Sequence, residues 1–238
     1  MKEDRSVGSS NDDTRVTQGR YDRQASLFDF MEAPVEFLAF RSLRKRLWSE
    51  VGGERLLEVG VGTGKNLGYH PEGIRSVGID LSPRMLARAA RRAERSGRHV
   101  DLILADAQNL PFRADVFDTA AATFVFCSVP DPVLGLSEVN RVVREQGRIH
   151  LMEHVRAGNS VIGRIMDLLN SIAVRLSGAN INRDTVSNVA VSGIRINSVE
   201  SRGFGIIKLI RCAALRQSDR GEEAELTSEE VTGDVALQ

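Results

Sequence analysis

Several features are scarce in this sequence, and each absence excludes a class of protein. Only two cysteines, Cys127 and Cys212, occur in 238 residues, which is too few for a disulfide framework or a cysteine metal site. No apolar run reaches the roughly 18 residues that a membrane-spanning helix needs. Residues 1–15 are polar, so neither a secretory signal nor an anchor is expected there. A reduced, cytoplasmic setting is therefore expected.

The chain as a whole has no excess of positive or negative charge, because 32 basic residues balance 32 acidic ones. The balance is uneven along the chain. Residues 21–215 carry 26 basic and 21 acidic side chains, whereas residues 216–238 carry two and seven. The excess on the body is too small to indicate a nucleic-acid partner, so none is expected.

The two ends of the chain differ in composition from its middle. Residues 1–20 and 216–238 are polar, which predicts a disordered N-terminal segment and an acidic disordered tail. Residues 21–215 are predicted to form one domain, because 42% of the chain is hydrophobic and can build a substantial core. One or two helices are expected within residues 22–50.

Strand and helix patterns alternate from residue 54 to about 155, which is typical of crossover units and a parallel sheet. Helices are expected from Ser82-Pro83 to Gly97, after Asp131-Pro132, and over the apolar residues 160–176. The gap between the last two strands suits an antiparallel hairpin. The strands are predicted as short apolar runs at 55–59, 75–79, 100–104, 116–125, 148–152, 194–199 and 205–211.

Three glycines, Gly60, Gly62 and Gly64, occupy alternate positions directly after the first predicted strand. Glycine at such a turn lets the backbone bend tightly and approach a ligand closely. The spacing differs from the GxGxxG and GxxxxGK[ST] loops that bind phosphates. The loop therefore predicts a ligand site at the end of this strand, but not a phosphate site.

Acidic residues stand at the ends of the first three strands. Glu58 precedes the glycine loop, Asp80 ends the second strand, and Asp106 follows the third. The carboxyl ends of parallel strands meet at one edge of a sheet, so these side chains are expected to line one crevice. A carboxylate at Asp80 suits a ribose diol, and one at Asp106 suits an adenine amino group. Such a crevice favours a cationic nucleoside over one that carries phosphates.

This combination resembles the class I S-adenosylmethionine-dependent methyltransferases, in the small-molecule branch that includes the ubiquinone and menaquinone methyltransferases. The resemblance implies an α/β fold with a Rossmann-like, doubly wound, seven-stranded sheet. That sheet would be mostly parallel, with an antiparallel C-terminal hairpin and helices on both faces. The motifs that carry the resemblance are ExGxGxG at 58–64, Asp80, Asp106-Ala107, and Leu110-Pro111-Phe112 followed by Phe117-Asp118.

The resemblance also implies a cofactor, S-adenosyl-L-methionine, and the residues that bind it. Asp80 would bind the ribose, and Asp106 and Ala107 would flank the adenine. Gly60 and Gly62 would pack under the methionine part, while Glu58 would hold the loop through main-chain contacts. The segment around Tyr21 resembles the N-terminal lid of the quinone methyltransferases, so residues 21–50 are expected to supply lid helices. The remaining expected cofactor contacts are Tyr21, Gly64, Leu81 and Phe124.

Methyl transfer from a sulfonium needs alignment more than a catalytic group, because the donor is already activated. A base or an orienting group for the acceptor is expected from Glu153 and His154 at the end of the fifth strand, with capping of neighbouring backbone as the alternative. Cys127 lacks the preceding proline of cytosine-C5 methyltransferases, so a packed thiol is expected. No metal site is expected, since the histidines form no cluster with metal-ligand spacing.

Two segments favour an apolar acceptor. Residues 35–48 combine large apolar side chains with the basic residues of 41–46, so this segment is a candidate for contact with an anionic membrane surface. Residues 160–176 are a candidate wall for an acceptor pocket. Packing on the core is the alternative for both segments.

The sequence thus predicts an S-adenosylmethionine-dependent methyltransferase that acts on a small, lipophilic acceptor, such as a quinol precursor or an amino-phospholipid headgroup. A small alkyl thiol is the alternative acceptor. From a different class, a non-catalytic S-adenosylmethionine-binding sensor or partner subunit also fits the sequence. The expected location is cytoplasmic, with peripheral membrane contact as an accompanying hypothesis.

Overall fold

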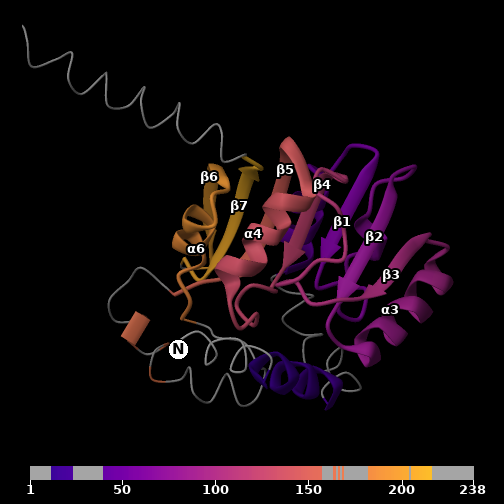
Figure 1. Cartoon of the computed structure of the whole chain (residues 1–238), viewed down its shortest axis with the longest axis horizontal. Helices are drawn as coiled ribbons and strands as arrows, with labels where there is room; N and C mark the ends of the chain where they lie inside the picture. Colours follow the sequence, from indigo (N-terminus) through magenta and orange to yellow (C-terminus); the bar gives the residue numbers. More distant parts are fainter. Residues whose placement is uncertain are drawn as a thin grey trace, which may run out of the picture.

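A computed structural model describes residues 12–23, 40–156, 182–203 and 205–215, together with 163, 164, 166 and 168. Its centre is a seven-stranded sheet in the order β3-β2-β1-β4-β5-β7-β6 (Figure 1). β7 runs antiparallel to β5 and β6, and the other neighbours are parallel. The predicted fold class is confirmed. The strands are β1 (Arg55–Val59), β2 (Arg75–Asp80), β3 (Val100–Leu104), β4 (Phe117–Thr123), β5 (Val143–His154), β6 (Arg195–Arg202) and β7 (Ile207–Ala213).

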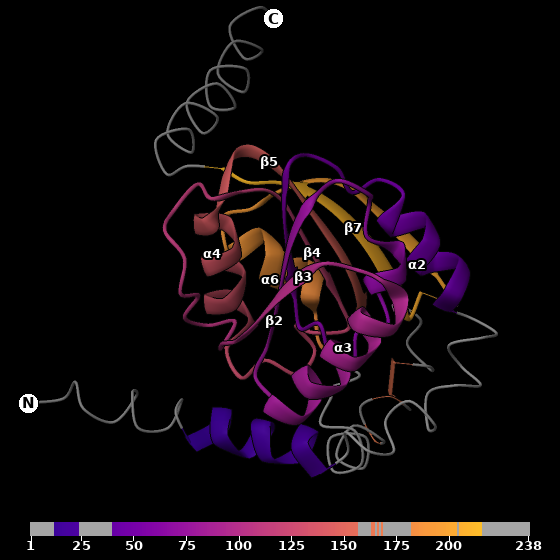
Figure 2. The same ribbon diagram turned by 90° about the vertical axis from the view of Figure 1, so that its right-hand side faces the viewer.

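Helices cover both faces of the sheet. α2 (Arg41–Trp48) and α3 (Pro83–Ser96) pack on one face, whereas α4 (Pro132–Val142) and α6 (Thr185–Val191) pack on the other (Figure 2). Side chains of β1 alternate between the two layers, as expected for a strand buried on both faces. Leu56 packs with Trp48 of α2, and Leu57 packs with Leu136 of α4.

Two of the helices begin at the caps that the sequence indicates. The Ser82 hydroxyl accepts a hydrogen bond from the N–H of Met85 at 3.1 Å, and α3 ends at Gly97 with φ +63°. The Asp131 carboxylate accepts one from Leu134 at 3.0 Å at the start of α4. α6, a short helix of seven residues, is not among the helices that the sequence predicts.

The strand boundaries differ from prediction where the backbone has unusual geometry. β4 ends at Thr123, two residues early, because Phe124 adopts φ +58° and cannot continue a strand. β5 begins at Val143, five residues earlier than predicted. It contains Gln146 at φ +56°, and its register against β4 is irregular in this part of the strand. The hairpin turn lies between Arg202 and Ile207, later than predicted.

Residues 12–23 form a helix, so the prediction of disorder is wrong for residues 12–20. Residues 24–39 lie outside the described part of the chain, as does the rest of the predicted disordered segments. The helix predicted over 160–176 lies largely outside it too; the four described residues there are helical. Among the described residues, no helix is long and apolar enough to cross a bilayer.

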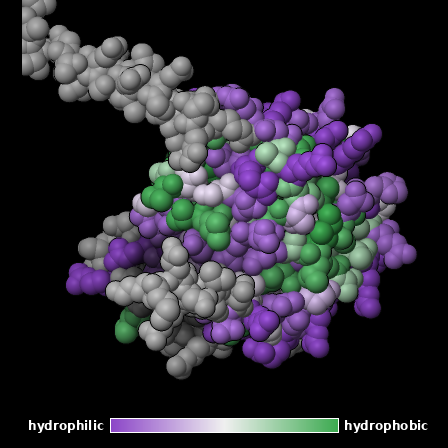
Figure 3. All heavy atoms as spheres, viewed as in Figure 1, coloured by the Kyte–Doolittle hydropathy of each residue, from purple (hydrophilic) through white to green (hydrophobic). Residues whose placement is uncertain are grey.

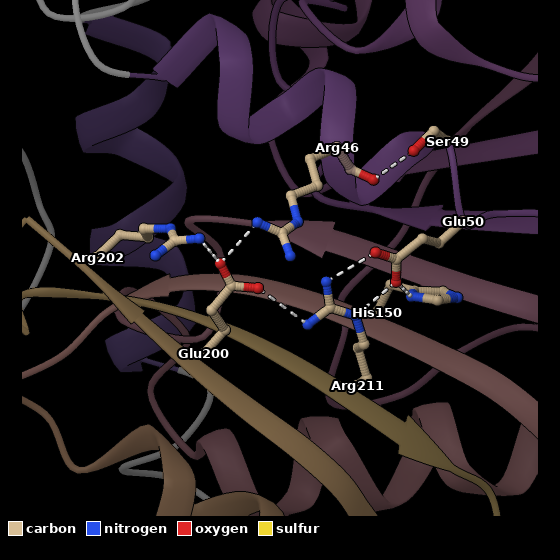
Figure 4. Close-up of polar contacts among 7 residues, drawn as sticks. All are labelled: Arg46, Ser49, Glu50, His150, Glu200, Arg202 and Arg211. Atoms are coloured by element: carbon tan, nitrogen blue, oxygen red, sulfur yellow. Dashed lines mark hydrogen bonds and ion pairs between the residues drawn. The ribbon is translucent and has the colours of Figure 1, made fainter.

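Charged side chains attach α2 to β6 and β7 (Figure 4). Glu50, just after α2, accepts two hydrogen bonds from Arg211, at 2.5 and 2.7 Å. Arg46 forms an ion pair with Glu200 at 2.9 Å, and Glu200 also contacts Arg211 and Arg202. This network fixes the helix whose opposite side borders the cavity described below.

The outer surface over α4 and α6 is mixed in character. Hydrophilic side chains surround separate apolar patches on this face (Figure 3). Leu134 of α4 and Val191 of α6 are among the exposed large apolar residues. Scattered apolar residues of this kind are normal on a folded domain.

Candidate cofactor-binding site

The glycine loop follows β1 and holds its glycines in the left-handed region, with φ of +66° at Gly60, +55° at Gly62 and +82° at Gly64. A Cβ on Gly60 would come within 2.4 Å of Val125, and one on Gly64 within 2.8 Å of Leu67. Among the described residues, a Cβ on Gly62 would meet no atom within 4 Å. Gly60 and Gly64 are therefore required by packing, whereas Gly62 borders open space where a ligand can approach the backbone.

A cavity of about 260 Å³ borders this loop. It lies at the carboxyl ends of the parallel strands, where the helix of residues 12–23 crosses the sheet edge (Figure 1). Glu58, Gly64 and Glu153 lie outside the described cavity wall. The other nine predicted site residues line the cavity: Tyr21, Gly60, Gly62, Asp80, Leu81, Asp106, Ala107, Phe124 and His154.

Asp80 ends β2 and turns its carboxylate toward the glycine loop. Oδ2 accepts a hydrogen bond from the N–H of Gly62 at 2.8 Å, and Oδ1 accepts one from Ser82 at 2.9 Å. Burial raises the pKa of Asp80 to about 6, although these two N–H groups act in the opposite direction. The side chain thus joins β2 to the loop and remains a carboxylate at neutral pH.

Asp106 follows β3 and lies beside Ala107 in the cavity wall. Its carboxylate accepts hydrogen bonds from the N–H of Gln108 at 2.9 Å and from the hydroxyl of Thr14 at 3.3 Å. Thr14 belongs to the helix of residues 12–23. Asp106 is therefore both a cavity acid and an attachment point for that helix.

Other side-chain contacts also attach the helix of residues 12–23. The Tyr21 hydroxyl shares a hydrogen bond of 2.6 Å with the hydroxyl of Ser128. The Asp22 carboxylate accepts one of 2.5 Å from Ser82, the cap of α3. Tyr21 and Thr17 both line the cavity, so the helix closes one side of it.

Glu58 is fully buried behind the loop. Oε1 accepts a hydrogen bond from Nδ2 of Asn66 at 2.6 Å, and Oε2 lies 2.8 Å from Nε2 of His70. The His70 ring stacks on Trp48 with centroids 4.6 Å apart. Glu58 was expected to contact the main chain of the loop. In the described part of the chain, its hydrogen-bond partners are instead the side chains of Asn66 and His70.

Glu153 is also fully buried, and it fastens the segment after β4. It accepts hydrogen bonds from the N–H groups of Val125, Phe126 and Cys127 at 2.9, 3.0 and 3.3 Å. Burial raises its pKa to about 7. Burial also raises the pKa of the Cys127 thiol, so this cysteine is no ready nucleophile. The geometry of Glu153 matches the backbone-capping alternative rather than the catalytic one.

His154, the next residue, faces the cavity within an aromatic cluster. Its ring stacks on Phe124 with centroids 4.4 Å apart, and Phe40 lies 4.7 Å from Phe124 and 5.7 Å from His154. Burial lowers the pKa of His154 to about 4, so its imidazole is neutral at physiological pH. One end of the cavity is thus built from rings rather than carboxylates.

Arg44 is the main cavity residue that the sequence reasoning missed. Its place in the basic run of residues 41–46 indicates an exposed surface, yet the residue is only 4% exposed and lines the cavity. The spacing Phe40, Arg44, Leu47 indicates the correct face, because residues three and four apart share one side of a helix. Phe40 and Leu47 are both buried.

The model of a methyltransferase domain family matches residues 57–151. This stretch runs from β1 into β5 and contains the glycine loop, Asp80 and Asp106. Residues 57–151 of this chain therefore match a methyltransferase domain.

Curated relatives of this methyltransferase domain differ in their acceptors. Phosphatidylethanolamine N-methyltransferase of Cereibacter sphaeroides is 38% identical over 133 residues, which are 54% of this chain and 64% of the relative. Demethylmenaquinone methyltransferase of Thermus thermophilus is 34% identical over 135 residues, 54% of this chain and 61% of the relative. The chain therefore aligns with less than two thirds of either protein.

A solved structure of an S-adenosylmethionine-dependent methyltransferase from Thermotoga maritima has the same fold. The TM-score is 0.66 at 21% identity, and the match covers 83% of this chain and 99% of that one. The described cavity fits the cofactor of such domains. Gly62 leaves open space over the loop, and the carboxylates of Asp80 and Asp106 suit a cationic adenosine derivative.

Proposed function

We propose that this chain transfers a methyl group from S-adenosylmethionine to a small, lipophilic acceptor. The observation that carries the proposal is a single cavity with two chemically different ends. Asp80 and Asp106 lie with the glycine loop at one end, whereas Phe40, Phe124 and His154 form the other. The first end suits the cofactor and the second an apolar acceptor.

In this proposal, different residues at the cofactor end contact the ribose, the adenine and the methionine part of S-adenosylmethionine. Asp80 accepts hydrogen bonds from the ribose diol, and Asp106 and Ala107 flank the adenine. Gly60 and Gly62 support the methionine part, because neither presents a side chain to it. Tyr21, Leu81 and Phe124 complete the contacts from the remaining cavity walls.

The protein's own task in this reaction is alignment and exclusion of water. S-adenosylmethionine supplies an already activated methyl group, so no strong catalytic group is required. The helix of residues 12–23 shields one side of the cavity. His154 is neutral and borders the ring end, so it suits orienting the acceptor through a hydrogen bond, whereas a pKa near 4 makes it a weak base. Glu153 is occupied by backbone N–H groups and takes no part.

The acceptor in this proposal is a quinol precursor or an amino-phospholipid headgroup. The two relatives named above methylate molecules of these two kinds, as their names state. The rings of Phe40, Phe124 and His154 offer an apolar surface to such an acceptor. A small alkyl thiol is the alternative.

A lipophilic acceptor resides in a membrane, so the proposal includes peripheral contact with an anionic surface. On α2, Arg41 and Lys45 are exposed, whereas Arg44 is buried and Arg46 is paired with Glu200. The apolar side of α2 packs on the sheet. The contact would therefore be electrostatic, without insertion of apolar side chains.

Turnover by the purified chain tests the proposal. The chain is incubated with S-adenosylmethionine and, separately, a naphthoquinol without its ring methyl group, phosphatidylethanolamine vesicles, or an alkyl thiol. Formation of S-adenosylhomocysteine and of the methylated product is measured by mass spectrometry. We expect turnover with the quinol or the phospholipid. Cofactor binding without turnover of any of the three would contradict the proposal and favour a sensor or partner subunit.

A further inference from the structure

One stretch of chain, residues 124–130, supplies a large part of the cavity wall. It follows β4, and all of its members except Phe126 line the cavity. Phe124 begins it at φ +58°, a conformation that a bulky side chain adopts only where the surrounding structure imposes it. We call residues 124–130 the wall segment. The contacts that hold the wall segment therefore determine the shape of the cavity.

Two charged side chains bind the backbone of the wall segment. Glu153 accepts hydrogen bonds from three of its N–H groups, as described above. Nη1 of Arg183 donates to the carbonyl oxygen of Phe126 at 3.0 Å and to that of Val129 at 2.5 Å. Backbone groups that are removed from water need such partners. The wall segment thus has a carboxylate on its N–H groups and a guanidinium on two of its carbonyl groups.

Arg183 is itself held in place by the elements around it. It directly precedes Asp184, whose carboxylate caps α6 by accepting a hydrogen bond from the N–H of Ser187 at 3.2 Å. The carbonyl oxygen of Arg183 accepts one from the N–H of Arg156, just after β5, at 3.1 Å. Burial lowers the pKa of Arg183, but a guanidinium remains charged in proteins. A fixed cation therefore reaches the wall segment from the start of α6.

The wall segment connects Arg183 to two features of the cavity. Val129 lines the cavity and packs in the same apolar cluster as Ala107, which flanks the adenine in the proposed function. Ser128, the residue before it, shares the 2.6 Å hydrogen bond with Tyr21 that attaches the helix of residues 12–23. A shift of the wall segment would therefore move a wall of the adenine site and loosen the helix that closes one side of the cavity.

We propose that Arg183 is a positioning residue for cofactor binding, because it holds the wall segment, through the carbonyl groups of Phe126 and Val129, in the shape that encloses S-adenosylmethionine. This inference rests on the proposed function, since it assumes that the cofactor occupies the cavity. Arg183 lies outside the described cavity wall, so its effect on the cofactor passes through the wall segment.

Calorimetry with S-adenosylhomocysteine tests this role without any acceptor or turnover. Arg183→Met removes both hydrogen bonds and keeps a long, unbranched side chain. We expect this variant to bind S-adenosylhomocysteine about 10-fold more weakly, at the lower end of the range for hydrogen bonds to charged groups. Arg183→Lys should restore most of the affinity, because both hydrogen bonds come from one nitrogen and an ammonium group can donate both.

Asp118→Asn is the matched control, because Asp118 also fixes a backbone segment. Its carboxylate accepts hydrogen bonds from the N–H groups of Glu54 and Arg55 at 2.6 and 3.0 Å. These groups lie at the start of β1, whereas the cavity adjoins the end of that strand. The control should lower the melting temperature and leave the affinity for S-adenosylhomocysteine unchanged. It thereby separates a loss of stability from a loss of position.

Each other result has a defined meaning. Unchanged affinity in Arg183→Met overturns the proposal, as does an equal loss in Asp118→Asn or a lysine variant as weak as the methionine variant. Should Arg183→Met fail to fold, hydrogen exchange of the wild-type chain provides the test. Bound S-adenosylhomocysteine must then slow the exchange of N–H groups in the wall segment, and unchanged exchange overturns the proposal. If the wild-type chain does not bind S-adenosylhomocysteine, the proposed function itself fails, and the role of Arg183 fails with it.

Discussion

Asp80 shows how one side chain serves both the fold and the site. Its two oxygens bind the N–H groups of Gly62 and Ser82, and burial raises its pKa to about 6. Each carboxylate oxygen can accept more than one hydrogen bond, so both remain able to accept from a ligand. Protonation removes the negative charge and part of this capacity. Cofactor affinity is therefore expected to depend on pH in this range.

We expect the affinity for S-adenosylmethionine to fall as the pH drops from about 7 to about 5, because Asp80 takes up a proton below its raised pKa. Above about pH 7 this dependence should be flat, since the group is then already charged. Asp80→Asn should bind roughly 10- to 100-fold more weakly at neutral pH and lose the dependence. Calorimetric titration across pH measures both effects.

Glu72→Gln serves as the control for this prediction, because the Glu72 side chain is 91% exposed and lies outside the cavity wall. It removes the same charge from the surface. An equal loss of affinity in both variants would indicate a general charge effect. Unchanged affinity in Asp80→Asn would contradict the ribose assignment.

The residues that could be predicted are those whose position follows from the chain order alone. Asp80 and Asp106 come at the ends of adjacent parallel strands, so topology brings them to one cavity. Glu153 and His154 also end a strand, but successive side chains of a strand point to opposite faces. The register and twist of β5 against β4 decide whether Glu153 or His154 points into the cavity. The sequence does not show that, and His154 faces the cavity.

The helix of residues 12–23 is an element that its composition does not predict. Short polar helices are marginal in isolation and depend on tertiary contacts. Here those contacts reach Asp106, Ser128 and Ser82, which are 60 or more positions away in sequence. No local pattern indicates such partners. Because two of the contacts adjoin the cavity, the helix is expected to slow the exchange of a bound cofactor.

We expect the double variant Thr14→Val with Tyr21→Phe to release the cofactor about tenfold faster. It removes the hydrogen bonds of Thr14 with Asp106 and Gln108 and that of Tyr21 with Ser128, and such bonds are worth roughly 0.5–1.5 kcal/mol each. Both changes nearly preserve shape, so the helix keeps its packing. Displacement of a bound fluorescent analogue in a stopped-flow instrument gives the rate. The control is Val16→Thr, at a half-exposed position of the same helix. If the double variant releases the cofactor at the same rate as this control, the helix does not slow cofactor release.

At the scale of the whole molecule, the alternation of strands and helices could be predicted, because strand lengths and helix caps are local signals, whereas the two-sided helix layers are what the family resemblance implies. The exceptions arise where distant groups decide the backbone. β4 stops before Phe124, and Glu153 accepts hydrogen bonds from the N–H groups of Val125 and Phe126 that follow. β5 starts early through Gln146, whose N–H donates to Ala214 beyond β7 at 3.0 Å. Such long-range bonds leave no trace in the local pattern.

The distribution of charge over the molecule also differs from what the sequence suggests. The basic cluster of α2 divides in three. Arg46 pairs with Glu200 (Figure 4), whereas Arg44 lines the cavity, and Arg41 and Lys45 are exposed. The membrane contact proposed above therefore depends on two charges. At about 1 kcal/mol for each basic residue near an anionic surface, they contribute roughly 2 kcal/mol.

We therefore expect weak, salt-sensitive flotation of the chain with vesicles that contain anionic lipid, and none with neutral vesicles. The double variant Arg41→Ala with Lys45→Ala should lower the partition constant of the protein onto anionic vesicles about 30-fold at low salt. This factor corresponds to roughly 2 kcal/mol. Arg91→Ala with Arg95→Ala removes two exposed charges from α3 and is the matched control. If the two double variants lose binding equally, the attraction belongs to the net charge of the body and α2 has no special part in it. If neither loses binding, the acceptor reaches the cavity by a route that does not involve this surface.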